Sequence, residues 1–385
     1  MTTIAIDAAP LGSGRGGDET SLLGMLSGLT AVAPADLRFA VLLPDDTQTP
    51  DPIAHHAAFD VHRIPRAGGL RRLTVTVPRA LRRIEPDLVL AFNHGPLWTS
   101  VPLALVVADV SFLRYPDHYP LSTRLRLRML IRRQASRAAI VITVSEFSRG
   151  EIMELLGIPA GRVAVVPNAV ALPPLPSTQD AAAGLVWLRD HGIADPFVLY
   201  LGNLHPRKNL GRLARGFLHA RSNNPAVAQA SLVVAGRTWW SGQDGDDWRR
   251  LVTNSAGAIA VIGPVTDSQK DTLLREAAAV AYLSLYEGFG LPPLEAMAHS
   301  TPVLASNAGS LPEILGDAAL LVDPLDVDAI GDGIVRILTD VQLRSRLVDA
   351  GRTQASQYSS DRTGTALIAA LRAAMSGLPA SAGTT

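Results

Sequence analysis

The chain has 385 residues, of which 47% are hydrophobic and 18% are charged, so it is not a disordered protein and is long enough for two cores. Its formal net charge is +0, which gives no argument for nucleic acid as a partner. It has no cysteine, which excludes disulfides, thiol nucleophiles and thiolate metal sites. We see neither a signal peptide nor an apolar run of about 18 residues, and we expect a cytoplasmic protein.

Short apolar runs alternate with longer helical stretches along the whole chain. The runs are continuous rather than alternating in polarity, which is typical of parallel strands buried on both faces. They lie at 4–6, 39–43, 88–92, 103–107 and 140–144 in the first half, and at 197–200, 232–235, 258–262, 280–284 and 302–305 in the second. We therefore predict an α/β protein with two doubly wound, Rossmann-like parallel-sheet domains. They would face each other across a crevice, with ligands outside the carboxyl ends of the strands.

The domain boundaries follow from composition. We expect a first domain over 1–171, and the proline-rich stretch from Leu172 predicts a stiff linker over 172–185. The second domain would cover 186–360. The spacing leaves open whether a last helix at 361–376 packs back on the first domain, and the small, polar tail 377–385 is expected to fray.

The first motif is a glycine-rich turn between a strand and an apolar helix, at 12–20. Gly16 and Gly17 would let the backbone approach a phosphate or a sugar. Two other interpretations stay open. One is a dinucleotide fingerprint with Asp45 as the ribose-binding acid, as in an oxidoreductase, and the other is a flexible surface loop.

The second motif, at 200–210, follows the first strand of the second domain. Asn203 lies in its turn, and Arg207 and Lys208 lie where the chain enters a helix. Arginine offers a fork of donors to phosphate and lysine a point charge, so the pair predicts a diphosphate clamp. The alternative is two cations that face solvent.

The third motif runs from Glu287 to Glu295. A Gly-Phe-Gly turn leads into a helix that starts with prolines, whose free N–H groups are expected to bind an anion. The two carboxylates would accept hydrogen bonds from hydroxyl groups, so phosphate and hydroxyls together suggest a sugar nucleotide. For Glu295 the alternative is an exposed helical glutamate.

Taken in order, these motifs strongly resemble glycosyltransferase family 4 over about residues 4 to 350. The resemblance rests on the glycine-rich loop followed by Val144-Ser145-Glu146-Phe147-Ser148, Val166-Pro167-Asn168, Gly202-Asn203-Leu204-His205-Pro206-Arg207-Lys208-Asn209, Val233-Val234-Ala235-Gly236-Arg237 and Glu287 with Glu295. It implies the GT-B fold and transfer of a hexose with retention of anomeric configuration.

The resemblance also implies roles for particular residues. Arg207 and Lys208 would hold the donor diphosphate, Glu295 the ribose, and Glu287 the donor sugar. The remaining donor-binding candidates are Gly16 and Gly17 from the first domain, Asn203 in the second motif, Gly236, Arg237 and Gly263 near the base, and Gly288, Phe289, Gly290 and Leu291 at the sugar. As catalytic residues we expect Glu287, Arg207, Lys208 and Asp109.

One position departs from the family pattern. Family members commonly have a His-Asp pair where this chain has Ala108 and Asp109, and that histidine contacts the donor sugar. Loss of one such donor costs about 3–4 kcal/mol of barrier. Three interpretations stay open: an active variant in which His94 or Asp109 compensates, an altered sequence, or a catalytically weak protein that binds nucleotide sugars.

For the substrates, the motifs look like those of bacterial mannosyltransferases of polysaccharide assembly. This favours GDP-mannose over UDP- or dTDP-sugars, and a saccharide or lipid-linked saccharide as acceptor. We expect no metal, because Arg207 and Lys208 would already neutralise a diphosphate. The stretch Asp244-Gly245-Asp246-Asp247 would then be a loop and cap for a helix starting near Asp247, rather than an Asp-x-Asp metal site, and Asp326 another helix start.

Arginine is concentrated in two segments. Residues 61–84 hold seven arginines and 118–145 hold six, in both cases without an acidic residue. Such segments predict peripheral contact with the inner face of an anionic membrane. The alternative is a solvated helix face.

Overall fold

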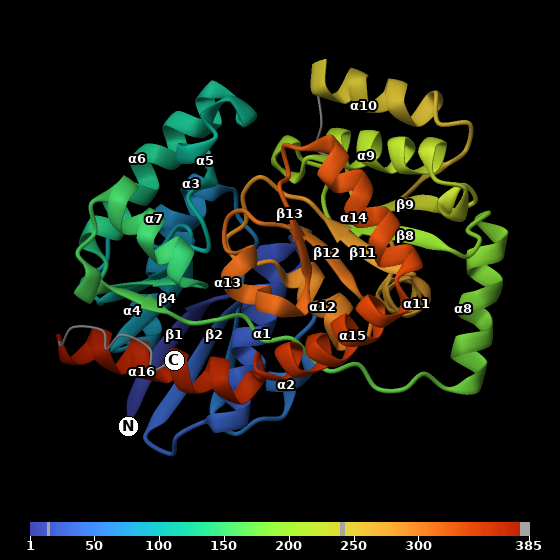
Figure 1. Cartoon of the computed structure of the whole chain (residues 1–385). Helices are drawn as coiled ribbons and strands as arrows, with labels where there is room; N and C mark the ends of the chain where they lie inside the picture. Colours follow the sequence, from blue (N-terminus) through green and yellow to red (C-terminus); the bar gives the residue numbers. More distant parts are fainter. Residues whose placement is uncertain (14–15, 239–242, 378–385) are drawn as a thin grey trace. The chain divides into compact units, whose positions relative to one another are not determined.

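The computed structural model describes residues 1–13, 16–238 and 243–377, and the chain divides into two compact units. Unit 1 comprises Met1–Ala169 and Tyr358–Thr385, and unit 2 comprises Val170–Gln357 (Figure 1). Each unit is built on its own wholly parallel sheet, of seven strands in unit 1 and six in unit 2. This is the predicted α/β architecture.

Unit 1 has the strand order β3-β2-β1-β4-β5-β6-β7. Its strands are β1 (Thr2–Asp7), β2 (Leu37–Pro44), β3 (Phe59–Ile64), β4 (Leu88–Phe92), β5 (Leu103–Val106), β6 (Ile140–Thr143) and β7 (Val163–Val165). Its helices are α1 (Gly17–Val32), α2 (Asp51–Ala54), α3 (Gly69–Arg71), the π-helical turn η1 (Arg72–Thr76), α4 (Val77–Ile84), α5 (Ser111–Arg114), η2 (Pro116–His118), α6 (Leu121–Arg137), α7 (Glu146–Leu156), η3 (Ala160–Arg162) and α16 (Ser360–Ser376).

Alternate residues of these strands pack into two hydrophobic cores, one on each face of the sheet. Ile4 and Ile6 of β1 belong to the core shared with α1 and α16, whereas Ala5 belongs to the core shared with α4 and α6. Because both faces are covered, the strands are apolar throughout, which explains the continuous runs in the sequence.

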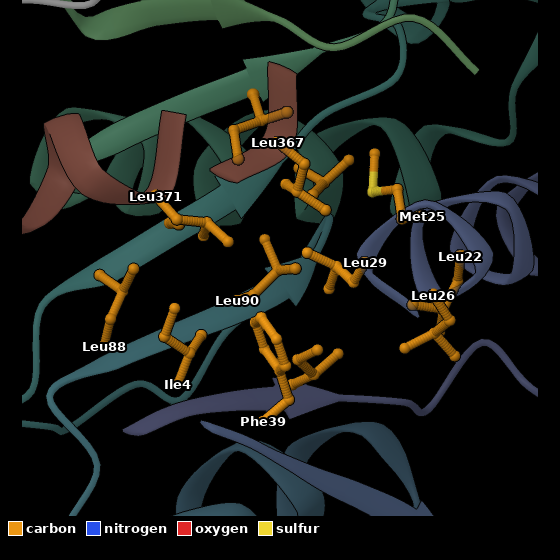
Figure 2. Packing of buried hydrophobic residues seen from close by; sticks show 14 of the residues in the cluster. Ile4, Leu22, Met25, Leu26, Leu29, Phe39, Leu88, Leu90, Leu367 and Leu371 are labelled. Carbon is orange, nitrogen blue, oxygen red and sulfur yellow. The ribbon is translucent and has the colours of Figure 1, made fainter. Parts of the chain in front are cut away.

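Helix α16 completes the first of these cores although it lies at the far end of the chain. Figure 2 shows Leu367 and Leu371 pointing toward the strands that carry Ile4, Leu88 and Leu90. Thr363 Oγ1 donates to the Pro167 carbonyl at 2.8 Å, and an exposed ion pair of 2.9 Å joins Arg372 to Asp36. The structure thus settles what the spacing of 361–376 left open: this helix belongs to unit 1.

Unit 2 has the strand order β10-β9-β8-β11-β12-β13. Its strands are β8 (Phe197–Leu201), β9 (Ser231–Ala235), β10 (Ile259–Gly263), β11 (Ala279–Tyr282), β12 (Val303–Ser306) and β13 (Leu320–Val322). Its helices are α8 (Thr178–Asp190), η4 (Pro206–Lys208), α9 (Leu210–Asn223), η5 (Pro225–Val227), α10 (Gln243–Thr253), α11 (Asp267–Glu276), α12 (Leu291–Ala298), α13 (Leu311–Leu315), η6 (Gly316–Ala318), α14 (Val327–Thr339) and α15 (Val341–Ser356).

Two local expectations were wrong. The segment 172–185 is not a linker throughout, because α8 begins at Thr178, where Ser177 caps it by accepting the amide of Asp180 at 3.1 Å. Helix α10 begins at Gln243 rather than near Asp247. Acidic residues in its first turns suit the helix dipole, and Asp246 pairs with Arg249 one turn on at 2.8 Å. Asp326 does cap α14, as predicted.

No helix in the described ranges is both long and apolar enough to cross a bilayer. Most of the tail 377–385 lies outside the described residues.

The crossing of α16 over α1 gives a first prediction. A Cβ atom on Gly364 would overlap the Gly28 carbonyl, so Gly364→Ala should force the two backbones apart and lower the free energy of unfolding by about 1–3 kcal/mol. The matched control is Gly150→Ala in α7, where nothing lies within 4 Å of the added carbon. It should stabilise by about 0.5–1 kcal/mol. Urea denaturation measures both, and equal effects would contradict the packing described.

Candidate active site

The sheet of unit 2 changes direction between β8 and β11. From β8 the chain adds β9 and β10 on one side, and from β11 it adds β12 and β13 on the other. Ligands of doubly wound sheets bind outside the carboxyl ends of the strands at such a switch point. The segments that follow these two strands contain the second and third motifs, so the topology brings them together.

Three glycines lie at the carboxyl ends of neighbouring strands β8, β9 and β10. Gly202, Gly236 and Gly263 have φ angles of 145°, 149° and 74°. The Gly236 amide donates to the Gly263 carbonyl at 2.8 Å, and a Cβ atom on Gly236 would overlap the Gly202 carbonyl. These strand ends therefore present backbone without side chains, as close approach of a ligand requires.

Two other predicted donor-binding residues follow these glycines. The Asn203 carbonyl accepts a hydrogen bond from the buried Tyr200 hydroxyl at 3.1 Å. The Arg237 side chain is exposed, and its carbonyl accepts the Leu204 amide at 2.8 Å. Both are held in the ladder that continues β8 and β9, at the same edge as the glycines.

Glu287 is the centre of the site and is bound by both predicted cations. It is 6% exposed; Lys208 Nζ donates to its Oε1 at 2.5 Å, and Arg207 Nη1 to its Oε2 at 3.1 Å. Arg207 also donates to the Tyr286 carbonyl at 2.8 Å, and Lys208 to the Tyr282 hydroxyl at 2.5 Å. The three side chains form one ion-paired triad with a net positive charge.

The charges of the triad decide the protonation of Glu287. Burial alone would raise the pKa of its carboxyl, but the charges of Lys208 and Arg207 outweigh burial and lower it to about 2. Burial also holds the pKa of the Tyr282 hydroxyl well above its usual value, so that hydroxyl stays protonated beside Lys208. The site thus contains a carboxylate, two cations and a neutral phenol.

The turn that carries Lys208 is fixed to the loop after β11. Asn209 adopts the left-handed conformation with a φ of 59°, and its side-chain amide donates to the carbonyls of Leu283 and Pro324 at 3.1 and 2.7 Å. The Leu285 amide donates to the Arg207 carbonyl at 2.8 Å. These hydrogen bonds hold η4 in position in addition to the ion pairs of Arg207 and Lys208.

Helix α12 begins at Leu291 after Gly290, whose φ is 103°. One expectation for this turn needs correction. Pro292 and Pro293 occupy the first turn and have no N–H, so the helix offers fewer amide donors than we expected. The backbone donors for an anion would have to come from Gly288 to Leu291, before the prolines.

The next loop supports this turn. A Cβ atom on Gly309 would lie 2.8 Å from the Glu287 amide nitrogen, so only glycine fits there. Ser310 donates from its amide to the Glu287 carbonyl at 3.2 Å and from its hydroxyl to the Phe289 carbonyl at 3.0 Å. Phe289 itself is buried, which anchors the turn in the core of unit 2.

Glu295 is half-buried on α12 and is held by α11. Lys270 Nζ donates to its Oε1 at 3.1 Å. One turn later, His299 Nε2 lies 2.7 Å from Asp271 Oδ1, so two contacts join the helices. Burial would raise the pKa of Asp271, but hydrogen bonds from Arg275 and His299 keep it below the usual value. Glu295 is therefore not the free surface glutamate of the alternative interpretation.

Unit 1 has a corresponding cluster at its own switch point, between β1 and β4. Asp7, at the end of β1, is buried and forms an ion pair with Arg72, which also donates to the His94 carbonyl at 3.3 Å. Asn93, after β4, donates to Asp18 Oδ2 in α1 at 3.1 Å. Burial outweighs Arg72 here and raises the pKa of Asp7.

The predicted glycines of unit 1 stand at the start of α1. Gly16 has a φ of 62° and precedes the helix, and nothing lies within 4 Å of a Cβ atom built on Gly17, its first residue. Part of the glycine-rich loop, residues 14–15, lies outside the described residues. The backbone at Gly17 is accessible to a ligand.

Ala108 and Asp109 follow β5 and are both half-buried. The Ala108 carbonyl accepts the Ser148 hydroxyl at 3.0 Å, and Asp109 Oδ1 accepts the Ser111 amide at 2.9 Å at the start of α5. This bond gives Asp109 a local structural role, and its catalytic role stays a prediction. His94 lies after β4 in the neighbouring strand connection, so it is on the same edge of the sheet.

Over the described residues, no group of three or more acidic or histidine side chains could hold a metal ion. Asp246 and Asp247 pair with arginines of their own helix, and the side chain of Asp244 lies outside the described part. The absence of a metal stays a prediction.

The sequence did not point to three residues of this site. Tyr282 binds Lys208, Lys270 binds Glu295, and Gly309 gives the backbone of Glu287 its space. Tyr282 could have been noticed as a polar residue at the end of an apolar strand, and Lys270 as one of only two lysines in the chain. Gly309 gave no signal of its contact.

The two parallel-sheet α/β units have the GT-B fold of known glycosyltransferases. The structure is similar to that of Anabaena HepE in complex with UDP and glucose, with a TM-score of 0.71 and 19% identity over 97% of this chain and 100% of that one. Sucrose-phosphate synthase from Thermosynechococcus elongatus gives a TM-score of 0.73 and 21% identity over 97% and 98% of the two chains. At these identities the likeness shows the fold.

The family follows from the sequence comparisons. Residues 188–354 match the model of glycosyl transferases group 1, and residues 15–172 match that of glycosyltransferase family 4. The chain is 34% identical to O-antigen chain mannosyltransferase B of Escherichia coli over 268 residues, 69% of this chain and 68% of that protein. It is 29% identical to the serotype-specific mannosyltransferase WbdA of Escherichia coli over 299 residues, 73% of this chain but 36% of WbdA. The chain belongs to the group 1 and family 4 glycosyltransferases, as its motifs predicted.

The triad predicts how stability depends on pH. The pKa of Glu287 is lower in the folded protein than in the unfolded chain, so its stabilising effect is complete above about pH 4.5 and is lost as pH falls toward about 2. At pH 7, Glu287→Gln removes the carboxylate that neutralises buried Lys208 and half-buried Arg207, and should cost about 3–5 kcal/mol. The difference between wild type and variant should shrink between pH 4.5 and 2 in denaturant titrations.

The control for this prediction is Glu154→Gln, which removes an exposed partner of Arg114 and should cost less than about 1 kcal/mol at any pH. A constant difference between wild type and Glu287→Gln down to pH 2 would contradict the ionised state of Glu287.

Proposed function

We propose that this chain is a retaining mannosyltransferase that moves mannose from GDP-mannose to a saccharide or lipid-linked saccharide acceptor in polysaccharide assembly. The observation that carries the proposal is the Lys208–Glu287–Arg207 triad at the switch point of unit 2, next to the strand-end glycines. A diphosphate needs cations and bare amides, and both occur here on backbone that the fold has already fixed.

The donor would lie along the carboxyl edge of the unit 2 sheet. Its base and ribose would contact the side of Gly236, Gly263 and Glu295, and its diphosphate would contact Arg207 and Lys208. The polar hydroxyls of the sugar suit the backbone of residues 288–291 and the remaining lone pairs of Glu287. We assign the acceptor to unit 1, where the Asp7–Arg72 pair and the exposed backbone at Gly17 offer polar groups.

The comparisons support a sugar nucleotide and favour mannose. The HepE structures contain UDP with glucose and UDP-glucose, which supports a nucleotide-sugar donor for a chain with the same fold. Two relatives that match most of this chain are named mannosyltransferases, which supports mannose over glucose. The guanine base rests on the resemblance of the motifs to mannosyltransferases, and so awaits the ligand titration below.

The chemistry follows from where negative charge develops. As the bond between the anomeric carbon and the diphosphate oxygen breaks, the leaving group gains charge, and Lys208 and Arg207 would stabilise it. Glu287 holds both cations in place beforehand, so little reorganisation is needed during the step. The acceptor hydroxyl would attack from the face that the diphosphate leaves, and the departing phosphate oxygen would take its proton.

Substitution of each of the two lysines of the chain should change a different kinetic constant. Lys208→Ala removes a group that is most needed in the transition state and should lower kcat at least tenfold. Lys270→Ala releases Glu295, which we place at the ribose, and should raise the donor KM while changing kcat little. Steady-state kinetics with matched donor and acceptor measure both.

Circular dichroism and denaturation midpoints of these variants control for folding, since Lys208 is buried. Wild-type kcat in a folded Lys208→Ala protein would refute the clamp. Stoichiometric donor binding by the wild type without turnover on any saccharide acceptor would favour the binding protein suggested by Ala108.

The donor prediction can be tested without an acceptor. GDP-mannose at 100 times its dissociation constant should stabilise the protein by about 2.7 kcal/mol, and equal concentrations of UDP-glucose or dTDP-glucose should stabilise it less. Glu295→Gln should weaken the effect of every nucleotide, whereas Glu154→Gln should not. Thermal denaturation measures these shifts, and a larger shift with UDP-glucose would overturn the choice of donor. Retention would appear as an α-linked product by NMR.

A further inference from the structure

Helix α6 (Leu121–Arg137) is held to unit 1 by one face only. Ile131, Gln134, Ala135 and Ala138, at its end and just beyond it, are buried, and Gln134 forms two hydrogen bonds with the backbone of Gly95, at 2.8 and 2.7 Å. Figure 1 shows the helix at the margin of unit 1 beside α5 and α7. Its other side is open to solvent.

That open side carries an apolar stripe that no core explains. Leu121, Leu125 and Met129 are spaced by four residues and therefore lie along one line of the helix. They are 66%, 47% and 67% exposed. A helix that only faced water would gain nothing from three large aliphatic side chains in a row.

Arginines lie on both sides of this apolar stripe. By helical geometry Arg124, Arg128 and Arg132 lie along one flank, and Arg126, Arg133 and Arg137 lie toward the other. Within the described ranges, no ion pair joins any of these six to a carboxylate. By contrast, Arg114 of neighbouring α5 is paired with both Glu151 and Glu154. The charge of α6 is thus not neutralised within the fold.

The surface beside the helix is hollowed rather than flat. A hollow of about 220 Å³ is lined by Arg124, Arg128 and Arg132 together with aliphatic side chains, Leu155 and Leu156 among them. A second, wider hollow adjoins it and shares Arg128, Arg132 and Leu156. A hollow lined by both guanidinium groups and aliphatic side chains suits a phosphate that is attached to a hydrocarbon chain.

The structure distinguishes the two arginine-rich segments. In 61–84, Arg66 pairs with Asp46 and Arg72 with Asp7, and Arg63 donates to the backbone of Pro44 and Thr47. Those arginines serve the fold of unit 1. The remaining four arginines of 61–84 form no ion pair in the described residues either, but α4 has no large exposed hydrophobic side chain beside them. The six arginines of α6 lie beside exposed Leu121, Leu125 and Met129, so the surface is α6.

We propose that the open side of α6 docks on an anionic lipid bilayer. The apolar stripe would enter the boundary between headgroups and acyl chains, and the flanking arginines would bind lipid phosphates. Two other occupants fit less well. A second copy of this surface would bring six further arginines against the first six, and a nucleic acid backbone offers nothing to the leucines and Met129. The inference rests on α6 alone and does not require the proposed transfer reaction.

Vesicle co-sedimentation of the full chain tests this without donor or acceptor. The protein should bind vesicles that contain phosphatidylglycerol, should bind less as salt rises, and should not bind phosphatidylcholine alone. The triple variant Arg124→Gln, Arg128→Gln, Arg132→Gln should partition about a hundredfold more weakly, from roughly 1 kcal/mol per arginine. Leu125→Gln with Met129→Gln should abolish the binding that survives high salt.

The matched control is Arg79→Gln, Arg82→Gln, Arg83→Gln, which removes the same charge from exposed positions of α4. It should retain most of the binding, and all variants should keep the wild-type denaturation midpoint. No binding to phosphatidylglycerol vesicles, equal binding to neutral vesicles, or equal loss in the control would each overturn the proposal. Because no nucleotide is present, failure here leaves the proposed transferase untouched.

Discussion

The geometry of the candidate site depends on one buried carboxylate, Glu287, held between Lys208 and Arg207. Glu287 and Lys208 are buried and Arg207 is half-buried, and these charges are stable only if they neutralise one another, so the loop after β11 and the turn after β8 must keep their relative position. Hydrogen bonds from the Asn209 side-chain amide and the Leu285 backbone amide set this relative position, and Gly309 leaves room for it. A buried ion pair adds little net stability, but here it fixes the relative position of the two loops that form the site.

Unit 1 also has a buried carboxylate at its switch point, but with fewer cations around it. Asp7 is also buried at a switch point but has one cation, Arg72, where Glu287 has two, and burial raises its pKa whereas that of Glu287 is lowered. The two units therefore offer different chemistry on the same topology.

Much of the fold was predictable because buried parallel strands have a plain signature. All ten predicted strands exist, and the three that were missed, β3, β7 and β13, are edge strands. Of these, β3 lacks a continuous apolar run, since it is paired on one side only and reads Phe-Asp-Val-His-Arg-Ile. The other two, β7 and β13, are apolar but only three residues long. The predicted linker was too long, because the prolines within 173–176 indicated an extended segment, whereas a helix capped by Ser177 begins at Thr178.

The sequence alone determined the class of protein, the two sheets and the motifs that meet at the switch point, because each is written in local patterns of apolar residues, glycines and charges. Only the tertiary structure decided that Lys208 and Arg207 bind Glu287, that Lys270 binds Glu295 and that α16 belongs to unit 1. It also decided that Arg66 and Arg72 form ion pairs, whereas the arginines of α6 form none in the described residues. These contacts join residues far apart in the chain. The spacing of residues in the sequence predicts which face of a helix or strand a side chain occupies. It does not predict which residue of another element will contact that side chain.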